Sequence, residues 1–296
     1  MHGCRPSARS GGQSPSYIQF RPNPACPSDR TMLKPIESNP EPSRDEQVHR
    51  DAIAEMTRRL ELVRDLPRLD RFRQTHELPQ AFFEHFDAFL EAYDRLIDYV
   101  LAYDGDNERI QCKKGCANCC IDLVRGLTTP EIINIYRFVR EWPDAREVFN
   151  YHRESAELFM RIVASQLKPG EPPPSGRDPR IAQAHVEFNR QNRPCGFLDQ
   201  TTGCCRIYPV RPIACRYFFS FDEPRTCSPL HVLYLKRRTR TIHLPESIHA
   251  LLREIDHAFG FRPLNYLSGG FCQFAAEVMH TRPVRVTNDA GPPPAE

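Results

Sequence analysis

Apolar residues recur at helical spacing along most of the chain. Between residues 79 and 103 they form one stripe: Phe82, Phe86, Phe89, Tyr93, Leu96, Val100 and Leu101. A period of three to four residues is typical of an amphipathic helix with one buried face. The same period predicts further helices over 45–65, 144–167 and 179–191.

Helix-start signals support three more helices. The segment "TTPEIINIYRFVREW" begins with a capping threonine, has Pro130 near its first helical position and places Glu131 in the first turn. The segments "PESIHALLREIDHAF" and "GGFCQFAAEVMH" also have helical patterns. The segment "HVLYLKRRTRTIHL", which directly precedes the first of these two, fits either a strand or a helix. It is rich in Val, Tyr, Thr and Ile, which favour strands. The chain is therefore expected to be mainly α.

The two ends of the chain lack such patterns. Residues 1–44 are rich in Pro, Ser and Arg, so we expect a disordered N-terminal segment. Residues 286–296 end in "GPPPAE" and are expected to form a flexible tail. This leaves 45–285 as a single helical domain, with an irregular cysteine-rich core at about 110–230.

Composition narrows the possible partners. The 296 residues contain 40 Lys and Arg against 38 Asp and Glu, a net charge of +2. This balance predicts neither a nucleic-acid surface nor a polybasic membrane anchor. No apolar run approaches membrane-spanning length, and residues 1–30 contain no apolar secretory-signal core. We therefore expect a cytoplasmic protein with neither nucleic acid nor membrane as a partner.

Cysteines supply the strongest chemical signal. Of the twelve in the chain, four fall within nine residues, "CKKGCANCC": Cys112, Cys116, Cys119 and Cys120. A second region contributes Cys195, Cys204, Cys205, Cys215 and Cys227. In a reducing compartment, clustered cysteines are more often metal ligands or redox groups than structural disulfides. The first cluster converges either as a helical face or as a tight turn at Gly115.

Several metal sites are compatible with these nine sulfurs. Two four-thiolate zinc sites need eight of them, and one 4Fe–4S cluster needs three or four. The spacing of Cys112, Cys116 and Cys119 also occurs in radical S-adenosylmethionine enzymes. However, the sequence after Cys120 is helical and lacks the repeated βα units of that fold.

Residues around the cysteines have simpler interpretations that compete with functional ones. Arg211 and Arg216 flank Cys215 and are predicted to offset thiolate charge from behind the ligands. His185 and Cys272 are interpreted as core residues. Helix capping and surface positions explain Glu131 and Asp122 better than acid–base catalysis does. Pro212 is expected to start a short helix that carries Cys215.

The cysteine motifs resemble the YkgJ-type cysteine-cluster family, described as a zinc- or iron-chelating domain with a CxxCxxCC motif. The resemblance is carried by "CKKGCANCC", "LTTPEI", "CGFL" and "CCRIYPVRPIACR". It implies a metal-ligand set of Cys112, Cys116, Cys119, Cys120, Cys195, Cys205, Cys215 and Cys227. The chain departs from the family pattern by an additional Cys204 and by a first gap of three residues instead of two.

Three functions remain open at this point. The metal is structural, or it belongs to an iron–sulfur enzyme, or it is cargo of a zinc or iron carrier. Flagellin lysine N-methylases carry a similar motif, and that resemblance implies an iron–sulfur cluster acting with S-adenosylmethionine on a protein substrate. The sequence does not decide whether the protein is an enzyme. In every case we expect the two cysteine regions to meet in space.

Overall fold

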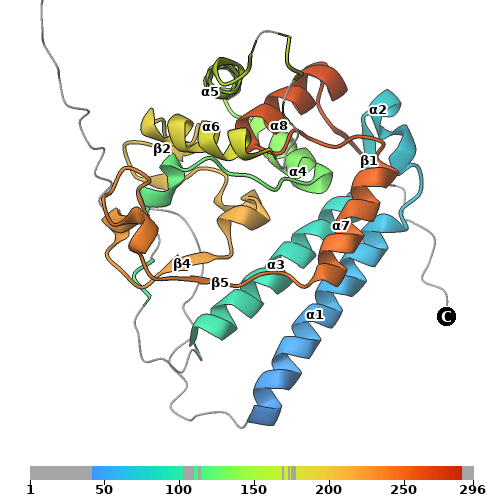
Figure 1. Cartoon of the computed structure of the whole chain (residues 1–296). Helices are drawn as coiled ribbons and strands as arrows, with labels where there is room; N and C mark the ends of the chain where they lie inside the picture. Colours follow the sequence, from blue (N-terminus) through green and yellow to red (C-terminus); the bar gives the residue numbers. More distant parts are fainter. Residues whose placement is uncertain are drawn as a thin grey trace, which may run out of the picture.

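The computed structural model describes residues 42–102, 110–112, 115–168, 170–172, 174 and 178–288, with side chains from residue 47 onward. Its helices form two groups, and the predicted mainly α fold is confirmed (Figure 1). The first group contains α1 (Pro42–Arg64), α3 (Gln80–Ala102) and α7 (Glu246–Ala258), which lie side by side. The second contains α4 (Thr129–Arg140), α5 (Ala145–Ser165), α6 (Pro179–Arg190) and α8 (Leu267–Gln273).

Strands in the described residues are short and occur in pairs. The parallel pair is β1 (Glu77–Pro79) with β6 (Arg285–Thr287). The antiparallel pairs are β2 (Leu198–Asp199) with β3 (Cys204–Cys205), and β4 (Phe218–Ser220) with β5 (Thr239–Thr241). The remaining elements are the short helix α2 (Phe72–Thr75), a π-helical turn at Phe274–Val278 and several 3₁₀ turns.

The predicted helices are recovered, with shifts at their ends. The first begins at Pro42, so three residues assigned to the N-terminal segment are helical. At the other end, β6 extends to Thr287, past the expected boundary of the tail. The ambiguous segment 231–244 contains both a 3₁₀ turn, η6 (Tyr234–Lys236), and strand β5. Residues 1–41 and 289–296 lie outside the described part of the chain. None of the described helices combines the length and apolarity needed to cross a membrane.

The main core lies along α3, which packs against α1, while α7 packs on another side of α1. The stripe of α3 is buried as predicted, and Phe82, Phe86, Phe89 and Tyr93 have no exposed surface. The ring of Phe82 contacts the edge of Phe259 at 5.7 Å between centroids. Such aromatic packing explains why α3 keeps its helical period over 23 residues.

The start of helix α4 is fixed by three hydrogen bonds to two carboxylates. The carboxylate of Glu131 accepts bonds from the backbone N–H and the hydroxyl of Thr128, at 2.8 and 2.7 Å, which completes the predicted capping box. Asp256 on α7 accepts a further bond from the N–H of Thr129 at 2.6 Å. These bonds satisfy N–H groups at the helix start and lock α4 against α7.

We expect Phe82→Ala to lower the free energy of unfolding by about 3–5 kcal/mol, because it leaves a cavity in a fully buried aromatic cluster. The matched control is Phe138→Ala on α4, where the side chain is 37% exposed and a loss of less than about 1 kcal/mol is expected. Chemical denaturation monitored by circular dichroism measures both. Equal losses would mean that α3 does not form the core.

Candidate metal centre

The first cysteine region is a turn, not a helical face. Gly115 has a φ of +78°, a conformation that glycine adopts without strain. After it, residues Asn118–Ile121 form a single 3₁₀ turn, η2, which carries Cys119 and Cys120. Cys112 lies apart from this turn and is fixed by β4, because the N–H of Ser220 donates to its sulfur at 3.1 Å. Of the two conformations that the sequence left open, the turn is therefore the observed one.

The two cysteine regions meet, as predicted. The N–H of Cys195 donates to the carbonyl of Cys120 at 2.7 Å, although about 75 residues separate them. Pairing of β2 with β3 then places Cys205 opposite Leu198, so Cys205 also lies close to this junction. Cys195, Cys205 and Cys120 consequently share one small volume of the protein.

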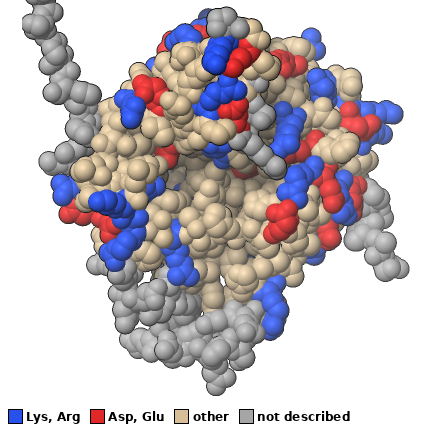
Figure 2. All heavy atoms as spheres, in the orientation of Figure 1, with Lys and Arg blue, Asp and Glu red and all other residues tan. Residues whose placement is uncertain are grey.

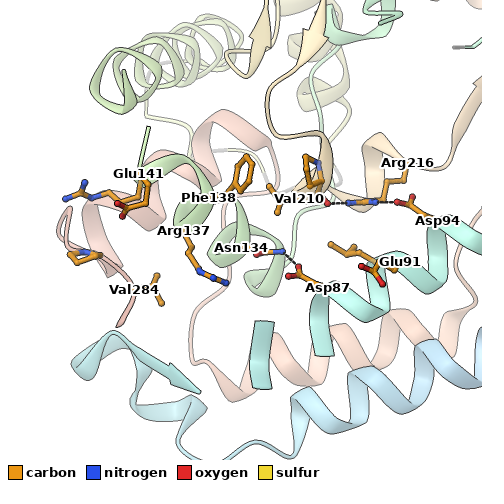
Figure 3. Close-up of a pocket in the computed structure, with 14 residues that line it drawn as sticks. Asp87, Glu91, Asp94, Asn134, Arg137, Phe138, Glu141, Val210, Arg216 and Val284 are labelled. Atoms are coloured by element: carbon orange, nitrogen blue, oxygen red, sulfur yellow. Dashed lines mark hydrogen bonds and ion pairs between the residues drawn. The ribbon is translucent and has the colours of Figure 1, made fainter. Parts of the chain in front are cut away.

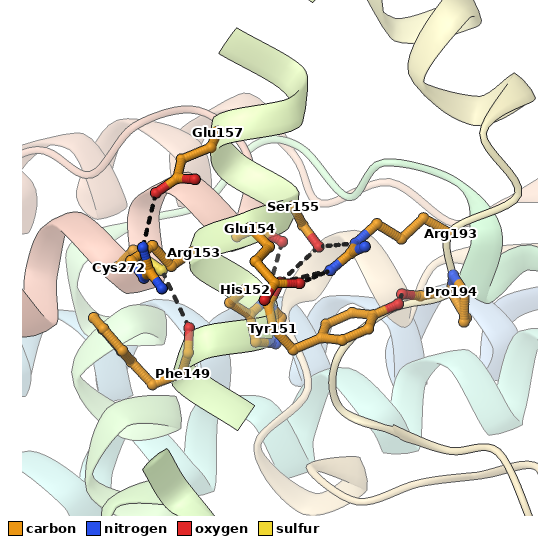
Figure 4. A network of polar contacts seen from close by, with 11 residues as sticks. Phe149, Tyr151, His152, Arg153, Glu154, Ser155, Glu157, Arg193, Pro194 and Cys272 are labelled. Carbon is orange, nitrogen blue, oxygen red and sulfur yellow. Dashed lines mark hydrogen bonds and ion pairs between the residues drawn. The ribbon is translucent and has the colours of Figure 1, made fainter. Parts of the chain in front are cut away.

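Gly196 of the "CGFL" motif is required by close packing. A Cβ atom at this position would lie 2.6 Å from the Nε2 atom of His152 and 2.7 Å from the ring of Tyr151. Both rings belong to α5, and the Tyr151 hydroxyl donates to the carbonyl of Pro194 at 2.7 Å. Figure 4 shows this contact beside the bonds from Arg193 to Ser155 and Glu154. The glycine therefore allows α5 to hold the segment that carries Cys195.

Glu131 positions Cys215 in addition to capping α4. Its second carboxylate oxygen accepts a bond of 2.6 Å from the N–H of Ile213, the first residue of the 3₁₀ turn η4 (Ile213–Cys215). Pro212 immediately precedes this turn, as predicted. Burial raises the pKa of the Glu131 carboxyl group, and the bonds from Ile213 and Thr128 oppose that rise. A residue interpreted as a simple cap thus also holds the backbone of a candidate ligand.

Cys227 lies on the far side of the first region. It belongs to the 3₁₀ turn η5 (Pro224–Cys227), which packs against η2 and buries the cysteine to 4% exposure. The Ser220 N–H donates to the sulfur of Cys112, and the Ser220 side chain opposes the rise that burial causes in the pKa of Cys227. Cys112 and Cys227 therefore both lie near Ser220 on β4.

Electrostatic coupling divides the thiols into two groups. Burial raises the pKa of Cys195 to about 12, and Cys205 raises it further. Cys215 is exposed at the surface, but the surrounding protein and the neighbouring Cys195 and Cys205 also raise its pKa. Cys120 is coupled to Cys195 and Cys205 in the same way, although its hydrogen bond to Cys119 has the largest effect.

The second group lies around Ser220. Burial raises the pKa of Cys112 to about 12, with further increases from Cys116, Cys119 and Cys227. Burial also raises the pKa of Cys227, which is affected by Cys119 and Cys116. The Cys119 thiol is the exception, because the hydrogen bond with Cys120 lowers its pKa. Cys119 influences both groups and lies between them.

The two flanking arginines have different roles. Arg211 lowers the pKa values of Cys119, Cys205 and Cys215, which fits the predicted offsetting of thiolate charge. Its guanidinium lies 4.3 Å from the ring centre of Tyr208, and its Nε atom has no hydrogen-bond partner among the described residues.

Arg216 also opposes the raised pKa of Cys205, but its hydrogen bonds are made elsewhere. Its side chain is fully buried and binds Asp94 at 2.5 Å and the carbonyls of Arg211 and Pro209 at 2.9 and 2.8 Å. The bond to Asp94 ties the guanidinium to α3. Figure 3 shows the Arg216–Asp94 pair at the wall of a cavity of about 660 Å³ between α3 and α4. No cysteine lines that cavity, so it is separate from the thiol groups.

Asp122 is the residue whose importance the sequence did not reveal. Its carboxylate accepts bonds from His185 at 2.7 Å, Asn189 at 2.8 Å and Tyr234 at 2.7 Å. These bonds outweigh burial, so the pKa of Asp122 is lowered. Asp122, interpreted as a surface residue, keeps 31% of its side chain exposed, and His185, interpreted as a core residue, keeps 23%. Together they join η2 to α6 and η6 through polar bonds.

The other two cysteines of the described residues, Cys204 and Cys272, lie outside the two groups. Cys272 is on α8, where its sulfur donates to the carbonyl of Phe149 at 3.9 Å (Figure 4). Its charged neighbours are Arg153 and Glu157, not other cysteines. Cys204 is buried on β3 and is not one of the free cysteines.

The thiol groups are close but do not have metal-site geometry. Within the described ranges, no three His, Cys, Asp or Glu side chains are arranged so that they could hold a metal ion. The free thiols of both groups nevertheless lie within electrostatic reach of one another, as their pKa values indicate. Their chemistry suits a soft cation such as zinc or iron.

The fold is mainly α and contains a cysteine-rich segment. Residues 111–231 match the family model described as "CxxCxxCC: Putative zinc- or iron-chelating domain". The resemblance inferred from the motifs is thereby confirmed. No curated protein matches the chain, and no solved structure matches it.

We expect Glu131→Gln to loosen the turn that carries Cys215. Loss of a buried charged acceptor should lower the free energy of unfolding by about 1–3 kcal/mol. It should also speed maleimide labelling of Cys215 in protein treated with a chelator, measured by peptide mass spectrometry. Glu141→Gln, at the exposed end of the same helix, is the control. Unchanged labelling of Cys215 would show that Glu131 acts only as a cap.

We expect His152 to make stability fall as the pH is lowered. Burial lowers its pKa from 6.5 to about 3, so only the unfolded chain gains a proton between these values. The stability contribution is therefore lost as pH falls below 6.5, by about 1.4 kcal/mol per pH unit. Urea denaturation at several pH values should give a shallower slope for His152→Phe than for the unsubstituted protein. Parallel slopes would mean that His152 is already protonated in the folded state.

Proposed function

We propose that this protein binds zinc or iron through eight cysteine thiolates, arranged as two groups of four. One group is Cys120, Cys195, Cys205 and Cys215. The other is Cys112, Cys116, Cys119 and Cys227. The proposal is supported by the match of residues 111–231 to a family model for metal chelation and by the mutual influence of the free thiols on their pKa values.

The bond between the Cys195 N–H and the Cys120 carbonyl is the observation that carries the proposal. The two residues are 75 positions apart in the sequence, yet the nitrogen of Cys195 lies 2.7 Å from the carbonyl oxygen of Cys120. A connection across such a long loop has an entropic cost that grows only slowly with length, but it must still be offset by local interactions. If cysteines on both sides of this junction bind one ion, the binding free energy offsets the entropic cost of closing the loop.

The donor chemistry favours a metal over redox exchange. Buried thiols with raised pKa values, such as Cys195 and Cys112, are neutral at pH 7 and therefore weak nucleophiles. A divalent cation reverses this preference, because it stabilises thiolates and releases their protons. Arg211 adds positive charge beside Cys205 and Cys215 and so lowers the cost of forming thiolates there.

We infer that the metal has a structural role. Between Cys195 and Cys227 the chain forms only two- or three-residue strands and 3₁₀ turns of three or four residues. Such a segment has few regular backbone hydrogen bonds, so metal binding would supply part of its folding free energy. The cysteine side chains would rotate toward a shared ion, since the backbone already brings their residues together. Location in the cytoplasm, where thiols stay reduced, is our expectation.

We expect Cys116→Ser to lower the metal content of anaerobically purified protein and to destabilise the fold. The loss could approach about 10 kcal/mol, because the binding free energy of a structural metal is also folding free energy. Elemental analysis with denaturant titration measures both. Zinc sites predict about two ions per chain and a colourless protein, whereas iron with equal sulfide and a brown colour indicates a 4Fe–4S cluster.

Cys272→Ser is the matched control, because Cys272 is a half-buried cysteine outside both groups. It should retain its metal and lose only about 1 kcal/mol. Equal metal content in the two variants would remove Cys116 from the ligand set. Rapid loss of metal to a chelator without unfolding would favour a carrier over a structural site.

A further inference from the structure

An unusually exposed apolar tip projects from the loop beyond Cys227. Val232 is 88% exposed and Leu235 is 91% exposed, with Leu233 between them at 46%. Among the other described residues, the most exposed large aliphatic side chain is Val186 on α6, at 55%. Single exposed aliphatic residues are common, but two nearly complete exposures three residues apart indicate a binding surface.

The loop that carries these residues is firmly anchored. Tyr234, between the exposed residues, turns inward and donates to Asp122 at 2.7 Å. The guanidinium of Arg237 lies 3.7 Å from the centre of the Tyr234 ring and 5.1 Å from that of Phe218. With Tyr234 and Arg237 fixed on the protein side, Val232 and Leu235 are held on the solvent side and cannot fold back.

Positive charge surrounds this tip. Residues 222–240 contain five Lys and Arg residues against two Asp and Glu residues. The side chains of Arg225 and Arg238 are 70% and 58% exposed, although each also pairs with an acidic neighbour. The segment forms the orange left edge of Figure 1, and Lys and Arg side chains gather on that edge in Figure 2.

We propose that residues 230–238 form a membrane-contact loop that inserts Val232 and Leu235 into the surface of an anionic bilayer. A protruding aliphatic side chain needs a complementary pocket to bind a protein, whereas the boundary between headgroups and acyl chains can enclose it without one. The basic residues beside it would lie at the level of the anionic headgroups. The overall charge and the lack of a long apolar run predicted that no membrane is a partner. Neither property tests whether a short loop binds a membrane surface.

The binding should be weak and reversible. Two aliphatic side chains and a few basic residues supply less than the two strong signals that stable anchoring requires. Each inserted side chain should contribute about tenfold to the partition coefficient. Lys236 should contribute about fivefold at low ionic strength. The loop would hold the cysteine region beside the membrane, because Tyr234 and Asp122 join the two.

Co-sedimentation of the full-length, metal-loaded protein with lipid vesicles tests this proposal. We expect binding to vesicles of phosphatidylcholine with phosphatidylglycerol, weaker binding to phosphatidylcholine alone, and a decrease at high salt. The double variant V232D/L235D should reduce the partition coefficient by at least about tenfold. Val186→Asp, an exposed aliphatic position on α6, should bind like the unsubstituted protein. All these side chains are exposed, so circular dichroism should be unchanged.

A second measurement reports insertion directly. The fluorescence of Leu235→Trp should shift to shorter wavelength when anionic vesicles are added, because the indole leaves water. Failure of the unsubstituted protein to sediment, or equal binding by the double variant, would overturn the proposal. So would light scattering that shows a dimer dispersed by the double variant, since the tip would then contact a second copy of the chain.

Discussion

The architecture of the cysteine region depends on the hydrogen bond from Cys195 to the carbonyl of Cys120. At 2.7 Å it fixes the start of the second cysteine region against the turn η2 of the first. The neighbouring contacts follow from it. Gly196 must come next because the rings of His152 and Tyr151 occupy the space a side chain would fill. The β2–β3 pair then returns the chain so that Cys205 faces the same junction.

Side chains supply the hydrogen bonds that a sheet would otherwise provide here. Glu131 accepts from the backbone of Ile213, and Asp122 joins η2 to α6 and η6. Arg216 donates to the carbonyls of Arg211 and Pro209 while it pairs with Asp94. A segment with so little regular structure cannot satisfy its backbone internally, so buried charged groups do so. Removing one partner would leave a desolvated charge, which makes these contacts more costly to lose than exposed ion pairs.

The helices were predictable because their signal is local. The stripe of α3 and the capping box of α4 each lie within one segment, and neither depends on a distant partner. Polar contacts of the cysteine region lack such a signal. Asp122 binds His185, which is 63 residues away in the sequence, and Arg216 binds Asp94, which is 122 residues away. Spacing alone therefore could not reveal the hydrogen-bond partners of Asp122 and Arg216.

For the candidate ligands, too, the sequence contained the local signal but not the long-range contacts. The cysteine motifs named eight candidate ligands and predicted that the two regions meet, but they did not divide the thiols between centres. The proposed division rests on β4, where both Cys112 and Cys227 lie near Ser220, and on the junction that brings Cys195, Cys205 and Cys120 together. Cys119 and Cys120 are adjacent in sequence and hydrogen-bonded, yet the grouping assigns them to different centres. Two centres that share this dipeptide would be mechanically coupled, because displacement of η2 at one centre moves a ligand of the other.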